Sequence, residues 1–171
     1  MPTRSPGPAR VPERLGIGTL HRARLGEVPR PALILGFAGL LPFLACAAGS
    51  WAAGDPAYII LINLQMAYGA IVLSFLGAVH WGLALAQEAA DNWRRLGPAV
   101  LPALVGWIAL MIPSPLGLLL LALGFVGMFF ADRAAVTANR APAWYAALRK
   151  PLTLVVLLSL VASYAALVAK L

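Results

Sequence analysis

The chain alternates between long apolar segments and short stretches that carry most of its charges. The apolar segments number five, at residues 32–53, 58–86, 93–112, 116–131 and 151–169. A hydrocarbon core about 30 Å thick is crossed by roughly 20 apolar residues in helical conformation, and a helix satisfies its backbone hydrogen bonds without water. The pattern therefore predicts an all-α polytopic membrane protein, a bundle of five transmembrane helices.

Prolines predict where these helices bend and end. Pro42 lies inside the first segment, and Pro98 and Pro102 lie inside the third. Each removes a backbone donor and favours a kink. The Pro-Ser-Pro run at residues 113–115 should end the third helix and begin the fourth, because proline is well tolerated in the first turn of a helix.

Composition supports a membrane protein and leaves no room for a soluble domain of useful size. Of the 171 residues, 61% are hydrophobic and 11% are charged, and the mean hydropathy is +0.85. Residues 1–30 are rich in Pro, Gly and Arg and predict a disordered tail ahead of a transmembrane domain at 31–171. A transit peptide is the less favoured interpretation of the tail, because proline interrupts any amphipathic helix there.

Lysine and arginine are distributed unevenly about the predicted spans. Twelve of the 13 lie in the tail, in residues 87–95 or in residues 132–150, which five spans place on one side, and Lys170 lies on the other. This asymmetry predicts a cytoplasmic N terminus, or one facing the mitochondrial matrix, with the C terminus opposite. We therefore expect a bacterial inner membrane, or the mitochondrial inner membrane if the source is eukaryotic.

The same distribution decides the expected partners. The lipid bilayer is one, and anionic lipid at the cytoplasmic face is another, because clustered cations at a membrane surface attract acidic headgroups. The net charge of +7 is accounted for in this way, so nucleic acid is not an expected partner. Trp93, Trp144, Tyr145 and Arg149 gather on this side and are predicted as interface anchors, the last three in a short interfacial helix.

One histidine, His80, stands beside Trp81 within the second segment. At 100° per residue its helical face also carries Gly69, Leu73, Leu76, Gly77, Ala84 and Gln87. Small residues at Ala70, Ser74 and Ala78 admit a close neighbour, so His80 should face or border another helix. A hydrogen bond that joins two helices is the favoured interpretation, with a proton or substrate site and a haem or metal site as alternatives. The sequence has no Cys or His spacing typical of a metal site, and we expect no metal or cofactor.

Two further polar residues, Asn63 and Gln65, lie in the other half of the second segment. We expect both to be buried and to hydrogen-bond across helices rather than to line a cavity. No Ser, His and Asp constellation and no phosphate-binding loop occurs in the sequence. Enzyme activity is therefore not predicted.

An acid and a base, Asp132 and Arg133, follow the fourth segment. The favoured interpretation is a salt-bridged pair at the cytoplasmic surface, which would stabilise the fold only slightly. The alternative is a polar cluster with His80 and Arg149. Under the favoured interpretation none of the five spans contains an internal Asp, Glu, Lys or Arg.

Several motifs taken together resemble a known family. They are "SFLGAVHWGLAL", "GWIALMIPSPLGLLLLALGF", the following "DR", and "PAWYAALRKPLT". Their order and content are similar to the family called domain of unknown function 3429, which includes transmembrane protein 69-like proteins of mitochondria and bacteria. The similarity covers roughly residues 30 to 170. It implies an integral inner-membrane protein of about five helices without an established activity, and it supplies no catalytic residue.

The function that these observations favour is an accessory or assembly protein, a scaffold that works through helix contacts with other membrane proteins. A small dimeric transporter or channel built around His80, Asn63 and Gln65 is the alternative, and a homodimer is possible in either case. A haem-binding electron-transfer protein is a weaker alternative, because it needs a second ligand from a partner copy or from a methionine.

Overall fold

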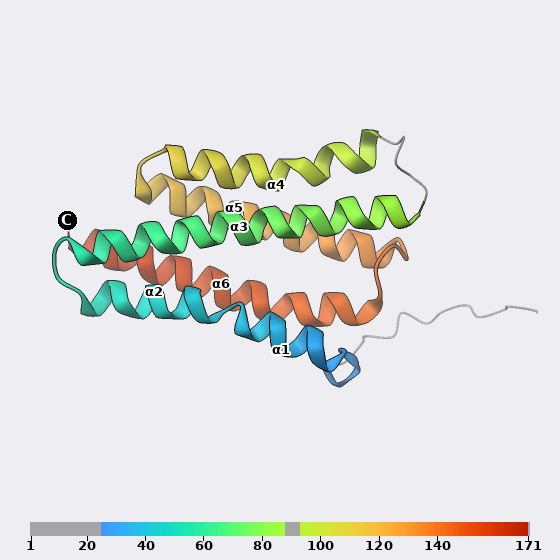
Figure 1. Ribbon diagram of the computed structural model, residues 1–171, viewed down its shortest axis with the longest axis horizontal. Coiled ribbons are helices and arrows are strands. Elements are labelled where there is room, and N and C mark those ends of the chain that lie inside the picture. Colours follow the sequence, from blue (N-terminus) through green and yellow to red (C-terminus); the bar gives the residue numbers. More distant parts are fainter. Residues whose placement is uncertain (1–24, 88–92, 171) are drawn as a thin grey trace, which may run out of the picture.

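The computed structural model describes residues 25–87 and 93–170, and all regular structure in these ranges is helical. The helices in chain order are η1 (Leu25–Glu27), α1 (Arg30–Ala38), α2 (Leu41–Ala52), α3 (Ala57–Ala86), α4 (Trp93–Met111), α5 (Ser114–Thr137) and α6 (Ala143–Ala169). Figure 1 shows the long helices lying side by side along one axis. With α1 and α2 together as the first helix, the predicted five-helix bundle is confirmed.

The first crossing is made by two helices that meet at a break. Gly39 and Leu40 separate them, and the Leu40 amide donates to the carbonyl of Phe37 (3.0 Å) in a tight turn. Pro42, in the first turn of α2, has no amide to continue the helical pattern, and this explains the break. By length and hydropathy, four stretches qualify as membrane spans: Arg30–Ala52, α3, α5 and α6. The fifth helix, α4, carries two arginines in its first turn and is not among them.

The central helix is α3, which packs against α2, α4 and α5. Glycine allows α4 to approach it closely. A methyl group at Gly106 of α4 would lie 3.1 Å from the Cα of Ala70, and one at Gly77 of α3 would overlap the carbonyl oxygen of Ala99. The second segment thus has a close neighbour, which it contacts at Ala70 as predicted and at Gly77 instead of Ala78, which is exposed. Close backbone contact matters in a membrane because lipid surrounds apolar side chains as favourably as another helix does. Close packing, and not the burial of apolar surface, therefore holds two helices together.

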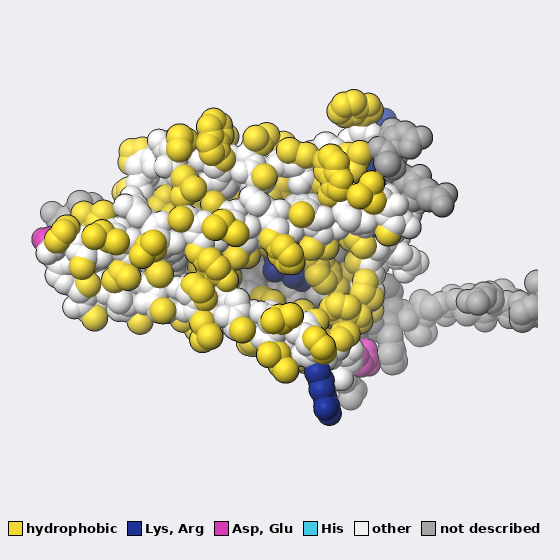
Figure 2. Space-filling model, in the orientation of Figure 1, with side chains coloured by type: hydrophobic (Ala, Val, Ile, Leu, Met, Phe, Trp, Pro, Cys, Tyr) yellow, Lys and Arg dark blue, Asp and Glu magenta, His cyan; other side chains and the backbone are white. Residues whose placement is uncertain are grey.

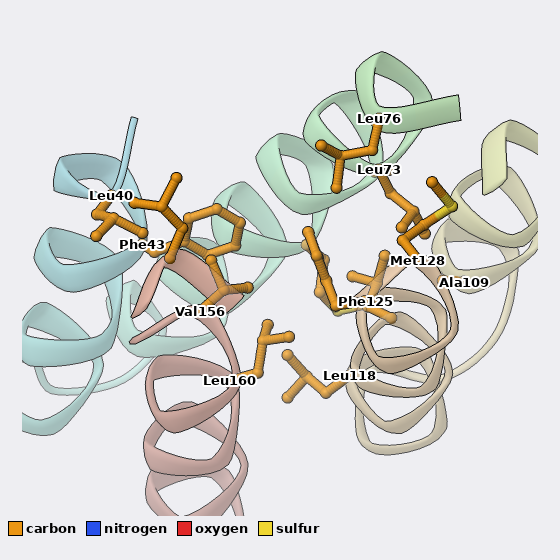
Figure 3. Packing of buried hydrophobic residues seen from close by; sticks show 14 of the residues in the cluster. Leu40, Phe43, Leu73, Leu76, Ala109, Leu118, Phe125, Met128, Val156 and Leu160 are labelled. Atoms are coloured by element: carbon orange, nitrogen blue, oxygen red, sulfur yellow. The ribbon is translucent and has the colours of Figure 1, made fainter. Parts of the chain in front are cut away.

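An apolar core fills the middle of the bundle. Phe43 of α2, Leu73 of α3, and Leu121 and Phe125 of α5 are at most 1% exposed, and Figure 3 shows residues of α2, α3, α5 and α6 converging there. The Phe43 ring meets that of Phe125 edge to face at a centroid distance of 5.9 Å. The face of the molecule drawn in Figure 2 is largely apolar too, which suits a lipid environment.

Helix ends differ from the predicted spans in ways that matter for function. α5 continues to Thr137 instead of ending at residue 131, and α6 begins at Ala143 rather than 151. The expected short interfacial helix is the start of α6, because Trp144 and Leu148 pack against the core and hold these turns in line with the rest. Of the predicted tail, Val28 is buried beside η1, and residues 1–24 lie outside the described ranges.

Candidate functional site

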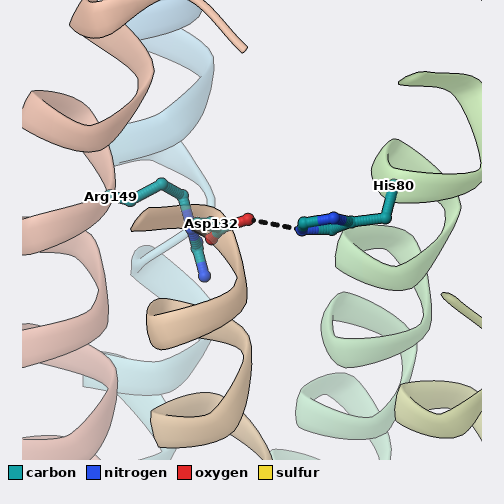
Figure 4. A network of polar contacts seen from close by, with 3 residues as sticks. All are labelled: His80, Asp132 and Arg149. Atoms are coloured by element: carbon teal, nitrogen blue, oxygen red, sulfur yellow. Dashed lines mark hydrogen bonds and ion pairs between the residues drawn. The ribbon is translucent and has the colours of Figure 1, made fainter. Parts of the chain in front are cut away.

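A buried carboxylate, Asp132 of α5, joins three helices. Its Oδ1 lies 2.9 Å from Nε2 of His80 on α3, and its Oδ2 accepts a hydrogen bond from Nε of Arg149 on α6 at 2.6 Å (Figure 4). The Asp132 side chain is fully buried. An ionised carboxylate only accepts hydrogen bonds, so His80 donates through Nε2. We call these three residues the His–Asp–Arg network.

The favoured surface pair of Asp132 and Arg133 is wrong, and the alternative cluster is what the structure contains. Neighbouring residues on a helix point about 100° apart, so Asp132 faces the bundle while Arg133 faces out. Arg133 is exposed, and its guanidinium lies 5.8 Å from the centre of the Phe129 ring. Arg149, predicted as an interface anchor, is only 7% exposed and neutralises Asp132 inside the bundle.

The sequence contained a signal for this network that hydropathy alone misses. The buried positions of α5 recur at alternating steps of three and four residues, at Leu118, Leu121, Phe125, Met128, Asp132 and Ala135. Asp132 therefore occupies a core position of a helix that continues past its last apolar residue. If the span is taken to end at its first charge, Asp132 falls in a loop. A contact of Asp132 with Arg149 inside the bundle is then not expected.

His80 lies on the bundle face of α3, as predicted. Gly69, Leu73, Leu76, Gly77 and Ala84, which share that face, are all buried. A pocket of about 20 Å³, with room for about one water molecule, adjoins His80. Its lining is His80, Leu83, Ala84, Gln87, Arg95 and Arg140. Arg95 donates to Oε1 of Gln87 at 2.9 Å, so His80 meets a small polar opening at the arginine-rich end of the bundle.

Three polar atoms on α6 stay unpaired beside the network. They are the Tyr145 hydroxyl, Nη2 of Arg149 and Oγ1 of Thr153, and all three are buried without a hydrogen-bond partner. The residues follow one another at steps of four, so they share one face of α6. Tyr145 lies close enough to Asp132 and Arg149 to interact electrostatically with both, and the Asp132 carboxylate is within reach of its hydroxyl group as an acceptor.

The other two polar candidates do not join this site. Gln65 is fully buried and donates to the carbonyl of Phe43 on α2 at 3.1 Å, the predicted bond across helices. Asn63 is exposed, contrary to the prediction, and accepts a hydrogen bond from Ser114 of α5 at 3.1 Å. Fifteen positions of helix, about 22 Å at 1.5 Å per residue, separate Gln65 from His80. A single site formed by all three in one copy is therefore ruled out by geometry.

The remaining aromatic candidates face outward to different degrees. Trp93 is 88% exposed and Trp81 is 41% exposed. Trp144 is half-buried, with its ring edge to face with that of Tyr145 at 6.2 Å. The role of Trp93 and Trp144 as interface anchors stays a prediction. In residues 25–87 and 93–170 no three His, Cys, Asp or Glu side chains gather as metal ligands, so the network offers proton donors, a carboxylate and a guanidinium.

Comparison with known proteins places this bundle among uncharacterised membrane proteins. A family model described as "Protein of unknown function (DUF3429)" matches residues 28–165. Transmembrane protein 69 of Xenopus tropicalis is 38% identical over 145 residues, covering 81% of this chain and 55% of the relative. Transmembrane protein 69 of Mus musculus is 33% identical over 139 residues, covering 79% and 56%. The chain thus spans about half the length of these relatives. No solved structure matches it.

Proposed function

Because this chain belongs to the DUF3429 family of transmembrane proteins, we propose that it is an accessory or assembly protein that binds other membrane proteins through its lipid-facing helices. The family carries no established activity. The proposal therefore rests on the surface and interior of this bundle.

The observation that carries the proposal is a change of side-chain size along the outer face of α3. Toward one end this face presents Ile71 and Phe75, each 66% exposed. Toward the arginine-rich end it presents Ala78, Gly82 and Ala86, all exposed, and a methyl group at Gly82 would meet nothing within 4 Å. Small residues four apart on a lipid-facing surface allow a second helix to approach to backbone contact.

The interior argues against a solute path through one copy. Beyond the His–Asp–Arg network the core is closed by Leu73, Leu121 and Phe125, each at most 1% exposed. Gln65 lies on the far side of this apolar layer and is hydrogen-bonded to α2. The dimeric transporter alternative would therefore need a path between copies, and no contact among the described residues favours one.

We further propose the membrane and the orientation. Six of the described Lys and Arg side chains outside the core lie at one end of the bundle, at Arg30, Arg94, Arg95, Arg133, Arg140 and Lys150. Lys170 lies at the other end, where it binds the carbonyls of Trp51 and Ala53. The positive end faces the cytoplasm or matrix by the usual rule, in the inner membrane of a bacterium or a mitochondrion.

The test is site-specific crosslinking in native membranes, followed by purification and mass spectrometry. A photoreactive residue at position 82 should capture a reproducible membrane protein, and Gly82→Leu should reduce its co-purification at least about tenfold by blocking close approach. The matched control is Ala165→Leu, at an exposed position of α6. Equal partner recovery from both leucine variants, or no captured protein at position 82, would contradict the proposal.

A further inference from the structure

Three parts of the chain meet around the small pocket beside His80. His80 and Gln87 come from the end of α3, Arg95 from the first turn of α4, and Arg140 from the turn between α5 and α6. Gln87 is exposed, so the pocket reaches the surface of the protein. Its volume of about 20 Å³ admits one water molecule, or one oxygen atom of a larger ligand that otherwise stays at the mouth.

The side chain of Gln87 links the two segments that carry the arginines. Its Oε1 accepts a hydrogen bond from Nη1 of Arg95 at 2.9 Å, and its Nε2 donates to the backbone carbonyl of Arg140 at 3.3 Å. A guanidinium carries five N–H donors, and this link uses one donor of Arg95 and none from the side chain of Arg140. Gln87 therefore positions both arginines at the pocket and leaves most of their donors for a ligand.

The charges around the pocket are unbalanced. Among the described residues every ion pair involves Asp132, whose partners are His80 and Arg149. Arg95 and Arg140 pair with none of the described acids, although both are half-buried. Two positive charges that are partly withdrawn from water attract an anion to the space between them.

The side chains that line the pocket suit a phosphate group. The N–H donors of a guanidinium match phosphate oxygens in a fork, and hydrogen bonds to an ionised oxygen are charge-assisted. Leu83 and Ala84 give the pocket an apolar wall, which strengthens the attraction by keeping water away. His80 closes it: 15% of the His80 side chain is accessible, whereas the Asp132 side chain bonded to it has no accessible surface. An anion in the pocket is thus kept apart from that carboxylate.

We propose that this pocket binds a phosphate group on Arg95 and Arg140, with one phosphate oxygen inside the pocket and with Gln87 as the positioning residue. The phosphate belongs either to inorganic phosphate or to the headgroup of a phospholipid, since the pocket lies at the arginine-rich end of the bundle. Once bound, it links α3, α4 and the turn before α6. The site does not include Gly82 or the lipid-facing surface around it.

The test offers two phosphate probes to the full chain in phosphate-free detergent buffer. Binding of inorganic phosphate is measured by isothermal titration calorimetry at constant ionic strength, and retention of phosphatidylglycerol by native mass spectrometry. Arg140→Gln should weaken binding of the phosphate probe at least about tenfold, because charge-assisted hydrogen bonds are lost. Gln87→Glu, at an exposed position, should weaken it as much, because a carboxylate there pairs with Arg95 and repels phosphate.

The matched control is Arg133→Gln. It removes one positive charge from the same end of the bundle, but Arg133 is exposed and does not line the pocket. This variant should bind the phosphate probe as wild type does. Equal weakening in Arg133→Gln and Arg140→Gln would overturn the proposal, because it would show a general attraction of anions to a positive surface.

The two probes distinguish the sources of the phosphate. A lipid source predicts that wild type retains phosphatidylglycerol but not diacylglycerol, which has no phosphate, and that Arg140→Gln loses this preference. A free source predicts heat from inorganic phosphate and the same lipid retention in both chains. Binding of neither probe would overturn the proposal, as would full displacement of the bound phosphate by chloride at an equal concentration.

Discussion

Removing one charge of the Asp132–Arg149 pair should destabilise the bundle far more than removing both. At 2.6 Å and an effective dielectric constant of 20, their attraction is about 6 kcal/mol. Desolvation of two ions offsets much of it, at several kcal/mol per ion. Asp132→Asn leaves the buried guanidinium without a counter-charge, and Arg149→Met leaves the carboxylate with His80 alone. Each should lower the free energy of unfolding by about 3–5 kcal/mol.

The double variant, Asp132→Asn with Arg149→Met, contains neither ion. The amide oxygen introduced at position 132 can still accept a hydrogen bond from His80, so the stability of this variant should lie within about 2 kcal/mol of wild type. Unfolding by added sodium dodecyl sulfate in mixed micelles, followed by tryptophan fluorescence, measures all three variants. Arg133→Met is the matched control, because that arginine is exposed and should change stability by less than about 0.5 kcal/mol. Additive losses in the double variant would refute the reasoning.

Two further variants test single contacts with the same unfolding assay. Gly77→Ala should lower stability by about 1–3 kcal/mol, because the methyl group would overlap the Ala99 carbonyl of α4, whereas Gly82→Ala in the purified chain should have almost no effect. His80→Ala should cost about 1–3 kcal/mol by leaving one Asp132 oxygen unsatisfied, whereas His80→Gln, which can still donate, should cost less. Equal losses within either pair would count against the assigned contact.

Periodicity predicted the parts of this protein that depend on a single helix. The fold class follows from the lengths of the apolar segments and the bundle-facing side of His80 from the spacing on α3, and the structure contains both. The ends of the helices were harder to predict from the sequence. Hydropathy falls at Asp132, although α5 continues to Thr137. Tertiary packing, and not local composition, extends that helix.

The contacts of Asp132 with His80 and Arg149 could not be predicted from any single segment of the sequence. His80 lies on another helix, and Arg149 lies ahead of a proline that marks the predicted start of the last span. Which faces of these helices meet is set by their packing, for example by the contacts of Gly69 of α3 with Leu121 of α5 and of Gly124 of α5 with Leu73 of α3. For Asn63 the error has the opposite direction. Its position within an apolar segment predicts a buried side chain, but the side chain is exposed.

The contacts of α6 with α2 join the last part of the bundle to be synthesised with the first. Trp51 near the end of α2 donates to the carbonyl of Ala162, and Lys170 binds the carbonyl of Ala53. α6 therefore covers one side of α2. Synthesis from the N terminus delivers Asp132 to the membrane before Arg149. Until α6 inserts, the nascent chain holds an uncompensated carboxylate and an uncovered α2. The last helix to be synthesised is therefore the one that supplies the counter-charge of Asp132 and covers the end of α2.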